Sequence, residues 1–375
     1  MELKRILLID KVWGECYTAS HVLLNRLTKL LASAMSVTMK QVAAYANVSV
    51  ATVSYVLNGT GVVTEATKQR VMAAVSALKY QPHHAARSMR GRSYTIGLTL
   101  PSAPGHLANP TLSEFLSGLS DAIAVRGYYL LLATVDDQEH EVEVSLDLVR
   151  TGRVDGMVLL DMQVDDARAH ALAAQQVPHV CAGFPPDTST SPFVTIDGHT
   201  GAVQAIHHLL NLRHRRIGLI QLPSELADSE PRYLGYTEAL VSAGLELDPL
   251  LVVEAGRNQE DGYQAMDELL GAPEPPTAVL ACNDELAFGA MHAAFNAGLE
   301  VGRDISVIGF DDVPLAAHVR PSLTTLRQPR LAFGEQIAML LVDAIERRER
   351  QSWQVMLETR LVIRQSTGPG PVVSH

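Results

Sequence analysis

Cysteine is scarce in this chain: its 375 residues include only Cys16, Cys181 and Cys282, and no two of them form a CxxC pair. An odd number of widely separated cysteines argues against a disulfide framework and against a zinc site. It also fits the reducing environment of the cytoplasm, where we expect this protein to work.

Long hydrophobic runs are missing as well, although 47% of the residues are apolar. No stretch of about 18 apolar residues occurs, so we predict no membrane-spanning helix and no membrane partner. The apolar run at residues 6–9 follows Lys4 and Arg5 but ends at Asp10, which makes it too short for a secretory signal. Export is therefore not expected.

Residues 1–34 show no pattern that connects them with the rest of the chain. One interpretation is that Met35 starts the native protein and that this segment is translated from an upstream stretch. The other is a genuine, loosely ordered extension. The intact mass of protein made from its native locus would distinguish them, because the first interpretation requires a product without Met1.

Lysine is absent from residues 94–375, which carry 18 arginines and 37 acids, whereas residues 35–93 carry seven Lys or Arg against one acid. A basic front segment on an acidic remainder fits a protein whose front binds a polyanion. On charge alone, a solvated helical face is an equal alternative.

Motifs of common enzyme classes are missing too, since the chain contains no GxSxG, P-loop, HExxH or GxGxxG pattern. The adjacent acids Asp311 and Asp312 point in different directions on one backbone, so they make a poor catalytic pair. His207, His208 and His214 have no metal-ligand spacing. We therefore predict no enzyme, no catalytic residue, no cofactor and no metal.

Residues 38–58 indicate a helix-turn-helix. Turn and capping residues at 47–49 interrupt a first helical pattern, and Ser49 can cap a second helix. Helices this short need packing partners in water, and a third helix is predicted at residues 65–78. The apolar residues of the first helix recur at helical spacing: Met39, Val42, Ala43 and Ala46.

The second helix would place its first turns against base edges in the major groove. Val50 and Ala51 suit thymine methyl groups, and Tyr55 is left to supply a polar base contact. Short polar side chains suit phosphates, although helix capping is their alternative role; these are Thr38, Ser49, Thr52, Ser54 and Asn58.

Residues 82–93 form a basic segment in which Pro82 can start a short helix and Gly91 can end it. We expect it to order only on DNA, paired with its copy from a second subunit. Met89 could act as a wedge in the minor groove, and Arg87 is a further expected DNA contact. A plain basic linker is the alternative.

The string VTMKQVAAYANVSVATVSYVLNG, together with Tyr80, Pro82 and the run AARSM at 85–89, resembles the lac/gal repressor family. The resemblance extends to about residue 365. It implies a homodimeric transcriptional regulator, most often a repressor of carbohydrate uptake or catabolism genes, that reads a near-palindromic operator. Relatives insert an apolar hinge side chain, usually leucine, where this chain has Met89.

The remainder alternates strand and helix patterns, which predicts parallel sheets covered by helices on both faces. The expected fold is α/β: an N-terminal all-α helix-turn-helix head plus a two-lobed, periplasmic-binding-protein-like body of doubly wound parallel sheets. We divide the chain into residues 1–34 (extension), 35–81 (head), 82–93 (hinge helix and linker), 94–365 (effector binding and dimerisation) and 366–375 (flexible tail, with no coiled coil).

Open parallel sheets bind ligands outside the carboxyl ends of their strands. The family resemblance implies effector contacts there for Arg232, Asn283 and Asp311, and with less support for Asn109, Asp161 and Gln328. Phe184 could cover the apolar face of a sugar ring. Asn283 could instead only cap a helix, and Arg232 could instead pair with Glu230 on the surface.

These residue types suit the hydroxyl groups of a sugar, because carboxylates accept hydrogen bonds and a guanidinium donates in a fork. The scarcity of clustered arginines near the strand ends favours a neutral sugar over a phosphorylated one. A nucleoside or a sugar phosphate is the alternative effector, and a sugar-binding receptor is the least favoured class. We expect the effector to close the lobes and so to change the spacing of the hinge segments.

Overall fold

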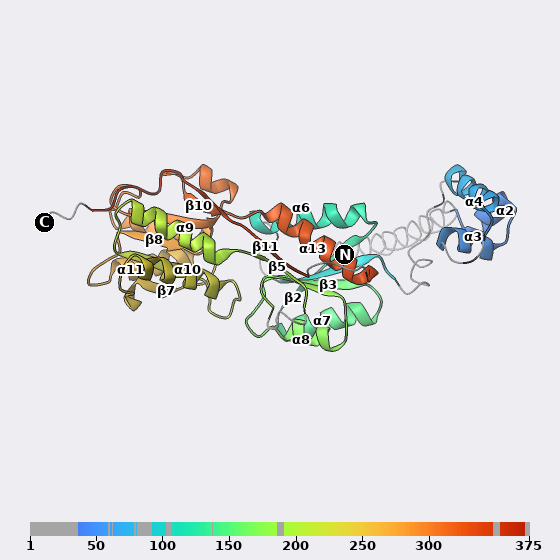
Figure 1. Ribbon diagram of the computed structural model, residues 1–375, viewed down its shortest axis with the longest axis horizontal. Helices are drawn as coiled ribbons and strands as arrows, with labels where there is room; N and C mark the ends of the chain where they lie inside the picture. Colours follow the sequence, from blue (N-terminus) through green and yellow to red (C-terminus); the bar gives the residue numbers. More distant parts are fainter. Residues whose placement is uncertain are drawn as a thin grey trace, which may run out of the picture. The chain divides into compact units, whose positions relative to one another are not determined.

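The computed structural model describes residues 37–58, 61, 63–78, 80, 92–102, 107, 109–136, 138–185, 191–347 and 353–371. The chain forms two compact units, one ending at Gly91 and one beginning at Arg92 (Figure 1). The expected extension 1–34 and the expected DNA contacts Arg87 and Met89 lie outside the described residues.

The described residues of the first unit form three helices, α2 (Met39–Ala46), α3 (Val50–Asn58) and α4 (Glu65–Ala77). The Thr38 side chain and Gln41 cap α2 reciprocally, and Asn47 ends it in the left-handed conformation. The helices are held together by a shared apolar core of Val42, Ala43, Ala46, Val53, Val71, Ala74 and Tyr80. The predicted helix-turn-helix with a third supporting helix is therefore present.

Lobe 1 of the second unit is built on a six-stranded sheet in the order β11-β5-β4-β3-β1-β2, and all its pairings are parallel. Two helices, α6 and α13, cover one face, and α7 and α8 cover the other (Figure 1). The strands are β1 (Thr95–Pro101), β2 (Tyr129–Val135), β3 (Gly156–Leu159), β4 (His179–Ala182), β5 (Phe193–Ile196) and β11 (Gln354–Leu357). The helices are α6 (Pro110–Val125), α7 (Gln138–Arg150), α8 (Ala167–Ala174) and α13 (Arg330–Glu346).

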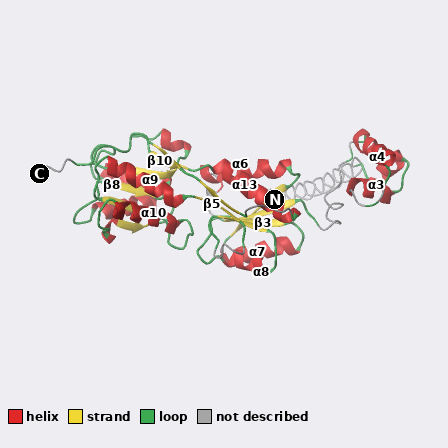
Figure 2. Ribbon diagram, in the orientation of Figure 1, coloured by secondary structure: helices red, strands yellow, loops and turns green. Residues whose placement is uncertain are grey.

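Lobe 2 has a second six-stranded sheet in the order β12-β10-β9-β8-β6-β7, in which only the β10–β12 pairing is antiparallel. Its strands are β6 (Ile217–Gln221), β7 (Val252–Glu254), β8 (Ala278–Ala281), β9 (Ser306–Asp311), β10 (Thr324–Arg327) and β12 (Arg360–Val362). Its helices are α9 (Gly198–Asn211), α10 (Ser229–Ser242), α11 (Gln259–Leu270) and α12 (Asp284–Asn296), with the short 3-10 helices η2 (Pro249–Leu251) and η3 (Pro314–Ala317). Each lobe combines a sheet with helices, as Figure 2 shows, so the predicted α/β fold class is confirmed.

The chain crosses between the lobes three times, after β5, after β10 and after β11. In lobe 1 the strands β5 and β11 are neighbours at one edge of the sheet, and in lobe 2 the strands β10 and β12 are neighbours at one edge. The covalent connections between the lobes are thus gathered on one side of the body.

The body begins earlier than the expected boundary at residue 94. Asp155 accepts hydrogen bonds from the backbone amides of Ser93, at 2.6 Å, and Tyr94, at 2.7 Å. The Arg92 guanidinium donates to the Ile345 carbonyl at 2.9 Å. Residues 92 and 93 are therefore fixed to lobe 1 and are not part of a free linker.

The segment expected to be a flexible tail from residue 366 is instead packed on lobe 2 as far as Gly370. The Ser366 hydroxyl donates to the Val307 carbonyl at 2.6 Å, and the Gly370 amide donates to the Leu212 carbonyl at 2.7 Å. A Pro/Gly-rich composition suggests disorder, but backbone groups of this segment form hydrogen bonds with lobe 2, including with Val307 near the start of β9. Within the described part of the chain, no helix is long and apolar enough to cross a membrane.

Candidate functional site

The exposed face of α3 presents the side chains that we expected to read bases. Val50 is 41% exposed and Tyr55 is 50% exposed, and Ala51 is exposed beside them. Val53, on the opposite face, is fully buried in the core of the head. The helix therefore turns its candidate reading residues outward because its apolar residue holds the other face inward.

Two of the short polar residues around α2 and α3, Thr38 and Ser49, act as helix caps in the folded head. The Ser49 side chain accepts a hydrogen bond from the Thr52 amide at 3.0 Å, and the Thr38 side chain accepts one from the Gln41 amide at 3.4 Å. Thr52 and Ser54 are partly exposed, and Asn58 ends the helix. Capping is compatible with phosphate contact, since an amino-terminal helix end attracts anions.

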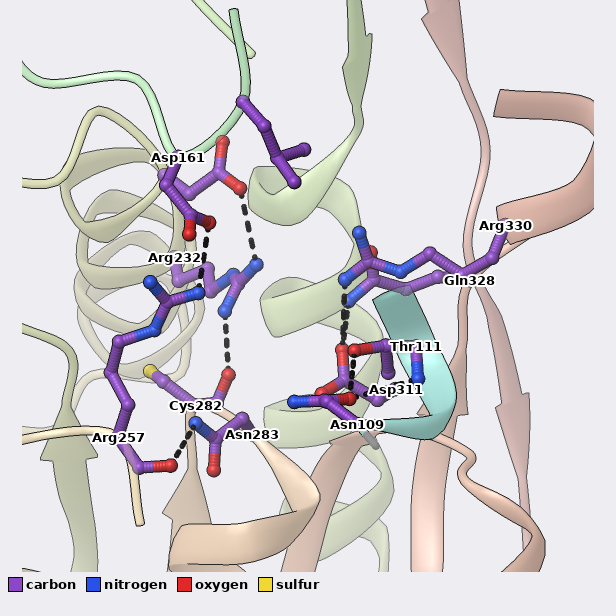
Figure 3. Close-up of polar contacts among 12 residues, drawn as sticks. Asn109, Thr111, Asp161, Arg232, Arg257, Cys282, Asn283, Asp311, Gln328 and Arg330 are labelled. Carbon is purple, nitrogen blue, oxygen red and sulfur yellow. Dashed lines mark hydrogen bonds and ion pairs between the residues drawn. The ribbon is translucent and has the colours of Figure 1, made fainter. Parts of the chain in front are cut away.

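A cavity of about 250 Å³ lies between the two lobes, at the carboxyl ends of their strands. Figure 3 shows polar contacts among residues at and beside this cavity. Among the expected effector contacts, those that line the cavity are Asn109, Asp161, Arg232, Asn283 and Asp311. Apolar side chains of both lobes complete the wall, including Phe115 and Phe333 from lobe 1 and Leu222 and Val313 from lobe 2.

Both asparagines at the cavity cap helices, although capping was expected as an alternative role only for Asn283. Asn109 accepts a hydrogen bond from the Thr111 amide at 2.9 Å at the start of α6. Asn283 accepts one from the Leu286 amide at 2.6 Å at the start of α12, and its amide nitrogen donates to the Arg257 carbonyl at 3.1 Å. Capping holds both side-chain amide groups at the cavity wall, so it is compatible with contacts to a ligand.

Arg232 is 4% exposed and lies inside lobe 2, so it does not pair with Glu230 on the surface. One of its terminal nitrogens donates to the Cys282 carbonyl at 2.5 Å, and the other lies 3.6 Å from the Asp228 carboxylate. Its Nε is buried without a hydrogen-bond partner. A buried guanidinium with an unsatisfied donor at a cavity wall has the capacity to donate to a ligand.

Asp311 ends β9 with the unusual backbone angle φ of 132° and points into the cavity region. Its carboxylate accepts hydrogen bonds from Gln328 at 2.5 Å and from Arg330 at 3.1 Å. Burial raises the pKa of Asp311, and the positive charges of Arg330 and Arg232 oppose that rise. Gln328 does not line the cavity, and its contact with Asp311 makes it a support for that carboxylate.

The sequence reasoning missed Arg257 and Arg330, which both line the cavity. Arg257 of lobe 2 pairs with Asp161 of lobe 1 at 2.9 Å, and the Asp161 charge raises the pKa of Arg257. The expectation that few arginines gather at the strand ends was therefore wrong. Arg330 opens α13 directly after β10, and that position was the available signal for it.

Phe184 does not line the cavity. Its ring packs against Phe193 in lobe 1, with the ring centroids 5.6 Å apart. Gly183, in the left-handed region with φ of 125°, redirects the chain at the end of β4 and so places the ring away from the cavity. No cluster of three or more potential metal ligands occurs among the residues that the structure describes.

Comparisons with known proteins match both units. Residues 38–83 match the bacterial regulatory proteins of the lacI family, and residues 206–367 match the periplasmic binding protein-like domain. The HTH-type transcriptional repressor CytR of Escherichia coli strain K12 is 35% identical over 332 residues, which cover 88% of this chain and 96% of CytR. The HTH-type transcriptional regulator CelR of Thermobifida fusca is 35% identical over 336 residues, which cover 88% of this chain and 98% of CelR.

Solved structures give the same result. A complex of the transcriptional regulator CelR with cellobiose has a TM-score of 0.69 and 34% identity, and covers 88% of this chain and 99% of that one. A lac repressor dimer bound to operator and the anti-inducer ONPF has a TM-score of 0.73 and 28% identity, and covers 89% of this chain and 99% of that one. The chain therefore belongs to the lacI family of bacterial regulatory proteins, and it is a DNA-binding transcriptional regulator, not an enzyme.

Proposed function

We propose that this regulator is a homodimeric, cytoplasmic repressor of carbohydrate uptake or catabolism genes, and that a neutral sugar bound between its lobes is the effector. The similarity to CelR in complex with cellobiose supports a sugar, and the similarity to a lac repressor dimer on its operator supports a two-fold symmetric DNA site. The scarcity of cysteine supports the cytoplasm.

The charge balance of the cavity is the observation that carries the sugar assignment. Among the wall residues that the structure describes, three arginines are accompanied by four carboxylates, those of Asp161, Asp228, Glu285 and Asp311. Arg257 is paired with Asp161, and Arg330 with Asp311. A ligand with many hydroxyl groups and no charge fits this wall, because hydroxyls can both donate to carboxylates and accept from guanidinium groups.

A sugar phosphate is disfavoured by the same balance, since a dianion would meet a wall whose carboxylates outnumber its arginines. A nucleoside is the effector class that the family resemblance left open. The aromatic rings in the cavity wall are Phe115 and Phe333, which are 1% and 3% exposed. Both rings are packed in the core of lobe 1. Neither ring therefore has a free face on which a base could stack.

The effector contacts that we propose are Asn109, Asp161, Arg232, Asn283 and Asp311, with Gln328 supporting Asp311. For the operator, we propose base reading by Val50, Ala51 and Tyr55. Arg87 and Met89 remain predictions from the sequence. Effector binding changes how the two lobes are positioned relative to each other. The coupling free energy between effector binding and operator binding is expected to be about 1–3 kcal/mol, the range typical of allosteric proteins.

A thermal-shift screen of the purified protein against monosaccharides, disaccharides, nucleosides and sugar phosphates tests the effector class. Ligand binding to the folded state raises the melting temperature by mass action. Neutral sugars should give the largest rise. A larger rise with a nucleoside or a sugar phosphate would replace the proposed effector class and leave the family assignment intact.

A further inference from the structure

The two lobes make a second set of contacts that is separate from the three chain crossings. The Val164 amide of lobe 1 donates to the Glu225 carbonyl of lobe 2 at 2.9 Å, and the Ala227 amide of lobe 2 donates to the Met162 carbonyl of lobe 1 at 2.9 Å. The pairing is a short antiparallel bridge. Backbone therefore joins to backbone across the cleft, in the pattern of two adjacent strands.

An ion pair accompanies this bridge. Asp161, which closely follows β3 of lobe 1, meets Arg257 of lobe 2 with 2.9 Å between the charged atoms (Figure 3). The Arg257 carbonyl is held in turn by the Asn283 amide at 3.1 Å. We call residues 161–164 and 225–227, together with Arg257, the cleft clasp.

The cleft clasp lies away from the hinge side of the body. The crossings leave from β5 and β11 in lobe 1 and from β10 and β12 in lobe 2. The clasp follows β3, β6 and β7, and the sheet order separates β3 from β5 by one strand and β6 from β10 by two strands. A hinge opening at the crossings would therefore pull the two sides of the clasp apart.

Arg168 fixes the lobe 1 side of the clasp. It is 5% exposed, and its guanidinium donates to the carbonyls of Leu160 at 3.0 Å and Asp161 at 3.3 Å. It also binds the buried carboxylates of Asp166, at 2.6 Å, and Glu141, at 2.7 Å. Asp161 has φ of 52°, a left-handed conformation that is unfavourable for a non-glycine residue unless its surroundings hold it.

We infer that the cleft clasp holds the lobes together before any effector binds, so that effector entry requires the clasp to open. Asp161 is then shared between two partners: Arg257 when the clasp is closed, and a hydroxyl group of the effector when one is bound. The effector response consequently includes the breaking of lobe contacts and is not a closure of free lobes alone.

Val164 offers a clean test because its side chain is 57% exposed and does not line the cavity. Val164→Pro removes the amide that donates across the cleft, and the bridge conformation of the preceding residue suits the extended backbone that proline requires. Val164→Ala keeps the amide and is the matched control. The measurement is amide hydrogen exchange in the full-length protein without ligand.

In the wild-type protein and in Val164→Ala, the Ala227 amide should exchange slowly, as a bonded amide does. Val164→Pro should raise its exchange rate about two- to tenfold, the range set by the loss of one net hydrogen bond. The Leu280 amide of the buried strand β8 should keep its rate in all three proteins and so report an intact lobe. Rapid Ala227 exchange in the wild type, or an equal rate in Val164→Pro and Val164→Ala, would overturn the clasp.

A second pair of variants tests the ion pair if Val164→Pro fails to fold. Arg257→Met should speed Ala227 exchange, whereas Arg303→Met, which breaks an exposed ion pair elsewhere in lobe 2, should not. Equal rates in these two variants would also overturn the clasp. Since no measurement here uses a ligand, these outcomes are independent of whether the effector is a sugar.

Discussion

The guanidinium of Arg232 lies over the ring of Phe310, with 4.2 Å between its central carbon and the ring centroid. Phe310 is buried at the end of β9, one residue before Asp311. The aromatic face stabilises a cation that burial would otherwise penalise. The pair thus connects Arg232 at the cavity wall to β9, the strand that carries Asp311.

Replacing Arg232 by alanine should remove the effector response. Loss of a charge-assisted hydrogen bond costs about 1.5–3 kcal/mol, which corresponds to roughly 10- to 150-fold weaker effector binding. Titration calorimetry with the ligand found in the screen measures this change. Affinity for operator DNA without ligand should stay within about twofold of the wild type; loss of DNA binding instead would mean that Arg232 serves the fold and not the cavity.

Removing the hydroxyl group of Tyr55 should relax base recognition. A polar base contact is worth about 1–3 kcal/mol, so Tyr55→Phe should weaken binding to the preferred operator by roughly 5- to 150-fold and change binding to random DNA little. Tyr45→Phe is the matched control, because Tyr45 is an exposed tyrosine on α2 and not on α3. Fluorescence anisotropy titrations with both duplexes measure these affinities. If Tyr55→Phe and Tyr45→Phe changed the two affinities equally, Tyr55 would make no polar base contact.

The expected hinge wedge is tested at Met89, which the sequence alone assigns to the minor groove. Met89→Gly removes the apolar side chain, so binding to a full two-fold symmetric operator should fall far more than binding to random DNA. Gel-shift titrations on the two duplexes give the comparison. If both affinities fell equally, no base step would be wedged open.

The carboxylate of Asp155 holds the first residues of the body by three hydrogen bonds, two of them from the backbone amides of Ser93 and Tyr94. Asp155→Asn loses the charge that strengthens these bonds and one of its acceptor atoms. Thermal unfolding should show a loss of about 1–3 kcal/mol. We also expect a smaller change of operator affinity on addition of effector, since residues 92–94 connect lobe 1 to the DNA-binding unit; an unchanged response would show that this attachment does not transmit it.

The raised pKa of Asp284 predicts that the stability of the protein depends on pH. Burial raises its pKa to about 7, and the neighbouring Asp311 charge contributes to the rise. In the unfolded chain the pKa of this carboxyl group is about 4. Between about pH 4 and pH 7 the folded protein therefore binds more protons than the unfolded chain, so the free energy of unfolding falls as the pH rises. Asp284→Asn cannot ionise, so its melting temperature relative to the wild type should be at least about 2 °C higher at pH 8 than at pH 5. An equal difference at both pH values would contradict this assignment.

Much of the fold could be predicted because its signals are local. The helices of the head follow from caps such as Thr38 and Thr64 and from apolar residues at helical spacing, and the central strands follow from continuous buried runs such as β1. The helix α11 carries the same kind of local signal, because Asn258 and Asp261 cap it reciprocally and its buried residues Ala265, Met266 and Leu269 recur at helical spacing.

The parts that could not be predicted depend on contacts between distant residues. Arg257 meets a partner 96 residues away in the sequence, and nothing near it in the chain distinguishes it from a surface arginine. Phe184 follows a strand end, as a ligand contact would, but the backbone angle of Gly183 turns it toward Phe193. His214 shows no motif, yet it is buried against the Gly368 carbonyl of the packed tail.

The most direct test of the central claim, that the cavity between the lobes controls DNA binding by the head, is an anisotropy titration of a duplex selected from a random pool. The titration is run on the wild type and on Arg232→Ala, each with and without the ligand that gives the largest thermal shift. The wild-type affinity should change at least about fivefold on addition of ligand, and the Arg232→Ala affinity should not change. A wild-type affinity that is the same with and without bound ligand would contradict the account.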